Sequence, residues 1–171
     1  KHSDYHVVNI DKLTYAGNLE SLKAVSHDPR YTFEQVDICD KEQIKRIFAS
    51  YQPVGILHLA AESHVDRSIV GPGEFIQTNI VGTFNLLDSI RKIVPYAIII
   101  YSSTNKVYGD FANLTFEETD TRYICQEFPN GIDETFPLSF ESPYGCSKGT
   151  ADQYILDYNR MYDIQSVVFR H

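Results

Sequence analysis

The sequence predicts an α/β protein built on a doubly wound, Rossmann-like parallel sheet. Segments with strand character alternate with segments of helical periodicity along the 171 residues. The strand segments are apolar throughout rather than at every second position, which is typical of parallel strands buried on both faces. Acidic or hydroxyl residues follow several of the strands, where ligands bind in such sheets. We therefore expect one domain, 1–171, whose sheet is covered by helices on both faces.

Residues 1–60 supply the first strands. Runs rich in β-branched and apolar residues predict three of them, at 5–10, 33–36 and 54–60. The first two runs end at Asp11 and Asp37. Between the strands, Ile44, Ile47 and Phe48 recur at helical spacing and predict a helix over 41–50, and residues 18–25 fit a shorter helix.

The rest of the chain continues the alternation. Four segments follow in the order helix, strand, helix, strand, over 72–94, 97–103, 143–162 and 166–169. Pro72 suits the first turn of the long helix, and Pro95 ends it. The stretch 111–141 is a long and mostly polar connection, which in a compact domain indicates a functional loop rather than a linker.

Composition excludes several classes of function. A net charge of -8 with no cluster of Lys or Arg argues against a nucleic-acid partner. The cysteines Cys39, Cys125 and Cys146 are odd in number and lack metal-binding spacing, so we expect reduced thiols, no metal and a cytoplasmic location. The longest apolar run, 97–101, is too short to cross a bilayer, and we expect no membrane association.

A tyrosine and a lysine stand four residues apart at the start of the last helix. Residues 142–148 read Ser-Pro-Tyr-Gly-Cys-Ser-Lys, so Tyr144 and Lys148 share one helix face. A phenol with its usual pKa near ~10 becomes a useful base when a fixed positive charge favours the phenolate. The pair can thus act as a general base toward an alcohol, although two solvated side chains on an amphipathic helix would show the same spacing.

Asp11 closes the first predicted strand. An acid at this point binds the hydroxyls of an adenine ribose and repels a 2′-phosphate, which favours NAD over NADP; alternatively it only caps the next turn. The glycine-rich turn that precedes such an acid by about 20 residues, and that binds pyrophosphate at a helix N-terminus, lies outside the 171 residues. We therefore expect a partial NAD-binding Rossmann domain without its first strand, and with most of the substrate domain absent.

Longer motifs resemble the extended short-chain dehydrogenase/reductase enzymes that modify nucleotide sugars. Residues 1–92 resemble dTDP-glucose 4,6-dehydratases through Asp11-Lys-Leu-Thr-Tyr-Ala-Gly-Asn and His58-Leu-Ala-Ala-Glu-Ser-His-Val-Asp-Arg-Ser. Residues 98–171 resemble CDP-tyvelose (CDP-paratose) 2-epimerases through Tyr101-Ser-Ser-Thr-Asn-Lys-Val-Tyr-Gly-Asp and the motif that begins at Ser142.

The resemblance implies an NAD cofactor, a nucleotide-diphosphate sugar as substrate, and roles for individual residues. Thr104 would hydrogen-bond the reacting sugar hydroxyl, Tyr144 would take its proton, and Lys148 would lower the pKa of Tyr144 and hold the nicotinamide ribose. Family members also commonly dimerise through two long helices, here 72–94 and 143–162. The cofactor contacts implied are Asp11, Lys12, Asp37, Ile38, Leu59, Ala60, Ala61, Ser63, Thr78, Ser102, Tyr144 and Lys148.

The two residues after Thr104 separate the alternatives. Dehydratases place Asp-Glu there, because eliminating water requires one group that removes a proton and another that protonates the departing hydroxyl. This chain has Asn105-Lys106. A 2-epimerase needs only oxidation to a ketone and return of the hydride to the other face. We therefore favour the epimerase, with the dehydratase as the alternative and a non-catalytic dinucleotide-binding module or fragment as a third.

Other residues receive structural interpretations. Glu62, His64 and Asp66 alternate like metal ligands but have no further partner in sequence, so we interpret them as hydrogen-bonding loop residues. His58 lies within a predicted strand and is expected to be a core histidine with its hydrogen bonds satisfied. Cys146 should face away from Tyr144 and Lys148 on the helix, which argues against a nucleophilic role.

We expect the 171-residue chain by itself to bind NAD weakly and to show little activity, because the pyrophosphate site and the sugar pocket are incomplete. Isothermal titration calorimetry with NAD measures this directly. A submicromolar dissociation constant would contradict the expectation.

Overall fold

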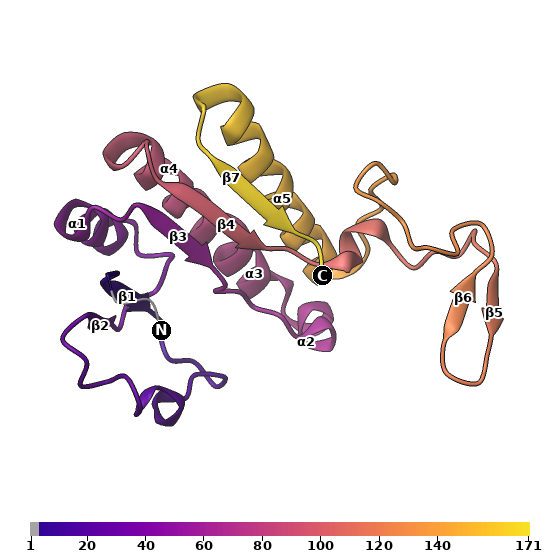
Figure 1. Ribbon diagram of the computed structural model, residues 1–171, viewed down its shortest axis with the longest axis horizontal. Helices are drawn as coiled ribbons and strands as arrows, with labels where there is room; N and C mark the ends of the chain where they lie inside the picture. The colour runs from indigo at the N-terminus through magenta and orange to yellow at the C-terminus, as the bar shows by residue number, and fades with distance from the viewer. Residues whose placement is uncertain (1–3) are drawn as a thin grey trace.

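The computed structural model describes residues 4–171 (Figure 1). Its strands are β1 (Val7–Ile10), β2 (Tyr31–Glu34), β3 (Gly55–His58), β4 (Ile98–Ser102), β5 (Phe116–Glu118), β6 (Tyr123–Cys125) and β7 (Ser166–Phe169). Its α-helices are α1 (Lys41–Tyr51), α2 (Val65–Val70), α3 (Pro72–Phe75), α4 (Thr83–Ile93) and α5 (Ser142–Tyr162). A π-helical segment, η2 (Ile76–Gly82), joins α3 to α4, and two short 3₁₀ turns are η1 (Leu19–Leu22) and η3 (Asn105–Tyr108).

The predicted strands form and are parallel. β3, β4 and β7 make one sheet in that order, with Leu57 opposite Ile100 and Ile100 opposite Val167. β1 and β2 make a second parallel pair, and among the described residues this pair is not hydrogen-bonded to β3. The predicted α/β class is therefore confirmed, but its strands lie in two sheets rather than in one.

The core lies between the three-stranded sheet and the long helices. Ile99 on β4, Leu87 and Ile90 on α4, and Ile155 on α5 are all fully buried. α1 adds the three apolar residues that predicted it, and it packs against α4. The predicted helices 41–50, 72–94 and 143–162 are thus confirmed, the second as the continuous run α3, η2 and α4. No helix within residues 4–171 combines the length and apolar character needed to span a membrane.

Among residues 4–171, helices cover one face of the three-stranded sheet, whereas the sequence pattern predicts cover on both faces. Side chains that alternate with the buried ones remain exposed: Leu57 at 68%, Ile98 at 46% and Phe169 at 55%. In Figure 1 α4 and α5 lie behind β4 and β7. Ile99 belongs to the same core cluster as residues of these two helices. The apolar pattern of the strands indicated two buried faces, but the described residues supply helices for one.

Two local predictions need correction. Residues 18–25 do not form an α-helix, because they offer no apolar face that is buried; they form the 3₁₀ turn η1, capped where the Asn18 side chain accepts from the Glu20 amide at 2.9 Å. The second strand covers 31–34 rather than 33–36. The connection 111–141 contains an unpredicted antiparallel hairpin, β5–β6, that projects from the body of the molecule (Figure 1).

Two neighbouring isoleucines on β4 test whether one face of the sheet is buried by helices and the other is exposed. Ile99→Ala should lower the free energy of unfolding by about 2–5 kcal/mol, because it leaves a cavity in a fully buried site. Ile98→Ala, on the exposed face, should lower it far less. Urea unfolding of both variants measures the difference. Equal losses would mean that the outer face is also buried in solution.

Candidate active site

A polar hollow of about 190 Å³ lies where β1, β2 and β3 end. Parallel strands bring their carboxyl ends to one edge, so residues far apart in sequence meet there. Of the predicted cofactor contacts, eight line this hollow: Asp11, Lys12, Asp37, Ile38, Leu59, Ala60, Ala61 and Thr78. Ser63, Ser102, Tyr144 and Lys148 do not line it. Their assignment as cofactor contacts stays a prediction, as does that of the other eight.

Two acids of the hollow differ in their surroundings. The Asp37 carboxylate accepts the Cys39 amide at 2.9 Å and pairs with Lys12 Nζ at 3.2 Å. Burial alone would raise the pKa of Asp37, but these two partners outweigh it and hold the pKa below its usual value. Asp11 Oδ1 accepts the Leu13 amide at 2.7 Å. The turn-capping role considered for Asp11 is therefore present, and it occupies only Oδ1.

The loop that carries Asp37 is fixed by the long helix. Asn85 Nδ2 donates to the carbonyls of Ile38 and Cys39, each at 3.1 Å. Gly82 lies so close to Ile38 that an added Cβ would stand 2.5 Å from its Cδ1. Sequence reasoning did not assign a role to either residue. The glycine within a helical pattern was the available signal, because such a glycine often marks close packing.

Tyr144 and Lys148 lie on the first turns of α5. The helix begins where Ser142 Oγ accepts the Gly145 amide at 3.1 Å, and Pro143 occupies a first-turn position. The Tyr144 ring meets the edge of Phe75 at a centroid distance of 6.4 Å. Cys146 is exposed, and its Sγ lies 3.8 Å from the Phe140 carbonyl.

Lys148 is only 3% exposed and reaches the end of β4. Its Nζ donates to the Ser102 carbonyl at 2.5 Å and lies 4.2 Å from the centre of the Tyr101 ring. Burial lowers the pKa of Lys148 to about 8, and the negative charge of Asp152 opposes that fall. The ammonium therefore joins α5 to β4 and is still mostly charged at neutral pH.

Thr104 follows β4 and is 6% exposed. Its Oγ1 accepts the Lys106 amide at 3.2 Å and so caps η3. η3 packs closely on the start of α5, since a Cβ on Gly145 would lie 3.4 Å from the Lys106 carbonyl. The structure thus gathers the predicted catalytic residues Thr104, Tyr144 and Lys148 around the junction of β4 and α5.

The structural interpretation of His58 is confirmed. The residue is buried, its Nε2 shares a 2.8 Å hydrogen bond with Thr83 Oγ1, and its ring lies 5.2 Å from that of Tyr101. Burial, with a smaller effect from Lys148, lowers the pKa of His58 to about 3, so the ring is neutral. Among residues 4–171, no three His, Cys, Asp or Glu side chains are placed to hold a metal ion.

Similarity to known proteins assigns the chain to a family. The sequence profile described as GDP-mannose 4,6 dehydratase matches residues 1–171. The chain belongs to this family. It is similar to dTDP-glucose 4,6-dehydratase from Neisseria meningitidis, with 48% identity over 170 residues that cover 95% of this chain and 44% of the relative. It is also similar to CDP-paratose 2-epimerase from Salmonella typhi, with 43% identity over 165 residues, 96% of this chain and 49% of the relative.

Solved structures agree with the family. The dTDP-glucose 4,6-dehydratase DesIV from Streptomyces venezuelae, determined with NAD and DAU bound, has a TM-score of 0.81 and 34% identity over 99% of this chain and 47% of its own. The chain spans about half the length of these relatives. Both resemblances found in separate halves of the sequence are thus present among the relatives, and each relative aligns over nearly the whole chain.

Lys148→Met tests the burial of the ammonium. The lysine has a lower pKa in the folded state, about 8, than its ordinary 10.5, so between these pH values the unfolded state binds more protons. Raising the pH therefore stabilises the wild-type fold through this residue, and the variant lacks that gain. Relative to Lys148→Met, the wild type should gain up to about 3 kcal/mol between pH 7 and pH 10.5.

Urea unfolding at several pH values measures this difference, and Lys45→Met on the surface of α1 reports general effects of alkali. A stability difference between wild type and Lys148→Met that does not change with pH would show that Lys148 is solvated rather than buried.

Proposed function

We propose that the protein carrying this chain is an NAD-dependent nucleotide-sugar epimerase of the CDP-paratose 2-epimerase kind. The observation that carries the proposal is the pair Asn105-Lys106 directly after Thr104. The predicted catalytic trio Thr104, Tyr144 and Lys148 is itself complete. The Salmonella typhi relative supports it.

The hollow at the strand ends fits the adenosine part of NAD. It offers the acid Asp11 for the ribose, the small residues Ala60 and Ala61 for close approach, and the Lys12–Asp37 pair beside them. When bound, NAD would supply the reversible acceptance of a hydride from the sugar. The hollow lies at the carboxyl end of β3, and Lys148 reaches the carboxyl end of β4, the adjacent parallel strand.

The chain's own residues would perform the proton chemistry. Thr104 would hydrogen-bond the reacting hydroxyl and hold it toward Tyr144, whose phenolate would take the proton. The buried Lys148 ammonium would favour that phenolate, and the Ser102 carbonyl fixes the ammonium in place. After the sugar turns, return of the hydride to the opposite face of the ketone carbon and of the proton from Tyr144 to the ketone oxygen would complete an epimerisation with no further acid or base.

Elimination of water would need more than these residues provide. Asn105 has no titratable group, and Lys106 is a cation at the position where the dehydratases carry a carboxylate. Asn105 and Lys106 are the first two residues of η3, and both are exposed. The 48% identity to the Neisseria meningitidis enzyme is the specific observation that favours dTDP-glucose 4,6-dehydratase as the second candidate.

Product analysis distinguishes the candidates. The longest polypeptide that carries this chain is incubated with NAD and, in separate tubes, with dTDP-glucose and CDP-paratose, and products are identified by NMR. Conversion of CDP-paratose to CDP-tyvelose supports the epimerase. A 4-keto-6-deoxy product from dTDP-glucose would replace it with the dehydratase. No product in either tube, with NAD bound, would favour a dinucleotide-binding module.

Tyr144→Phe should lower the turnover number by about 10²–10⁴-fold, because it removes the group that takes the proton and leaves the ring contact with Phe75. Affinity for NAD should change far less than turnover, because the variant removes the hydroxyl of only one of the predicted cofactor contacts. Steady-state kinetics and calorimetry measure the two effects. Tyr123→Phe, on the exposed hairpin, is the matched control, and a Tyr144→Phe variant with wild-type turnover would exclude Tyr144 as the base.

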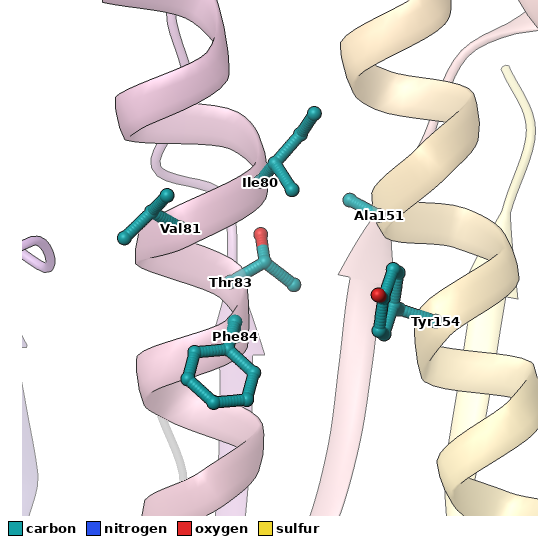
Figure 2. Close-up of a pocket in the computed structure, with 6 residues that line it drawn as sticks. All are labelled: Ile80, Val81, Thr83, Phe84, Ala151 and Tyr154. Atoms are coloured by element: carbon teal, nitrogen blue, oxygen red, sulfur yellow. The ribbon is translucent and has the colours of Figure 1, made fainter.

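We also propose that the protein is cytoplasmic and a homodimer joined through α4 and α5. Figure 2 shows the apolar groove between α5 and the continuous run of η2 and α4. It is lined by Ile80, Val81, Thr83, Phe84, Ala151 and Tyr154, and its volume is about 150 Å³. Phe84 is 39% exposed and Tyr154 49%. Phe84→Glu should give a monomer by light scattering, whereas Val70→Glu on α2, at a residue that is 90% exposed, should not.

A further inference from the structure

A carboxylate without a role in the proposed chemistry is buried directly behind the site. Asp152 lies on α5 four residues after Lys148, hence on the same face and one turn farther along the helix. It has no solvent exposure. A carboxylate is removed from water at considerable cost unless it is paired and hydrogen-bonded, so its partners indicate what it does.

One partner belongs to the turn that presents Thr104. Ser103 Oγ donates to Asp152 Oδ2 at 2.8 Å, and Ser103 is itself only 3% exposed. The Ser103 amide donates to the Phe169 carbonyl at 2.7 Å. Ser103 is therefore held on its side chain by α5 and on its backbone by β7. The position of Thr104, the next residue, follows from these two bonds.

The second partner is a guanidinium that connects three elements. Arg170, just after β7, forms a two-pronged pair with Asp152: Nε lies 2.9 Å from Oδ2 and Nη2 lies 2.8 Å from Oδ1. Its Nη1 donates to the Tyr108 hydroxyl on η3 at 3.0 Å. This planar geometry restricts the orientation of the carboxylate more than a lysine would. Asp152 is thus the point at which α5, β7 and the turn from β4 to η3 are joined.

We propose that Asp152 is a positioning residue for the site: it fixes Thr104 through Ser103 and supplies the negative charge that faces Lys148 from within the protein. The proposal rests on the proposed function insofar as Thr104 and Lys148 act in the reaction. Asp152 touches neither the hollow nor a reacting atom, so it acts only through these neighbours.

Among the titratable groups around Lys148, Asp152 is the one that supplies the negative charge. The titratable groups that face Lys148 are His58 on β3, Tyr101 on β4, and Tyr144 and Asp152 on α5. His58 is neutral, and burial with the nearby negative charge keeps the Tyr101 phenol protonated by raising its pKa. Arg170 is engaged with Asp152 and Tyr108. Loss of the Asp152 charge would therefore leave burial of Lys148 unopposed.

Two substitutions separate the two effects. Asp152→Asn removes the charge, so the pKa of Lys148 should fall further and the alkaline limb of the rate profile should move to lower pH. Ser103→Ala keeps the charge and removes only the hydroxyl bond. It should leave the pKa of Lys148 unchanged and lower the turnover number by about 10–100-fold through displacement of Thr104.

Three further variants keep the test interpretable. Asp152→Asn leaves Arg170 buried without its partner, which can prevent folding; Asp152→Asn with Arg170→Met removes both charges together and avoids that penalty. Asp152→Glu keeps the charge and should retain the wild-type pKa of Lys148. Asp157→Asn, on the exposed face of α5, is the matched control and should change nothing.

The measurement is an NMR titration of the protein with lysine labelled with ¹³C at Cε, in which the Lys148 resonance is assigned by its loss in Lys148→Gln. It reports the ammonium without requiring turnover. A lowered pKa in the charge-removing variants, with Asp152→Glu and Asp157→Asn like wild type, supports the proposal even if neither sugar is converted. An unchanged pKa in those variants overturns it, even if the wild type is an active epimerase.

Discussion

The contact between the Lys148 ammonium and the Ser102 carbonyl holds the site together. At 2.5 Å it joins the first turns of α5 to the last residue of β4. Because Tyr144 precedes Lys148 by one helical turn, this hydrogen bond places both residues relative to the end of β4, and the bonds of Ser103 then place Thr104. A charged donor in a poorly hydrated setting makes such a bond stronger than a neutral one.

Burying that ammonium costs hydration free energy, and the surrounding residues compensate for the loss through several interactions. The Tyr101 ring presents its face to Nζ, the Ser102 carbonyl accepts from it, and Asp152 lies one turn away on the same helix. Asp152 is in turn hydrogen-bonded by Arg170, which also donates to the Tyr108 hydroxyl on η3. If Lys148 has its proposed role, function and stability are opposed here, because an apolar residue in its place would cost less free energy to bury but could not favour a phenolate.

The hollow proposed for the cofactor depends on a separate arrangement. The long run α3, η2 and α4 contributes Thr78 to its wall and, one turn or more further on, Gly82 and Asn85 to the loop that carries Asp37 and Ile38. The helix can approach that loop closely only because Gly82 lacks a side chain. The same run also forms one wall of the groove with α5, so the proposed dimer face and the proposed cofactor site share a structural element.

The sequence by itself determined the element types, the parallel α/β class and the side chains at the strand ends, because apolar runs, helical periodicity and the Tyr144–Lys148 spacing are local properties. It could not determine the hairpin 116–125 or the failure of 18–25 to form a helix, since these depend on what buries each segment. The sequence also indicated helices on both faces of the sheet, whereas helices of the described residues cover one face. Only the tertiary structure paired Asp152 with Ser103 and Arg170, because contacts across 49 and 18 residues follow from the packing of α5 on the sheet and leave no periodic signal in the chain.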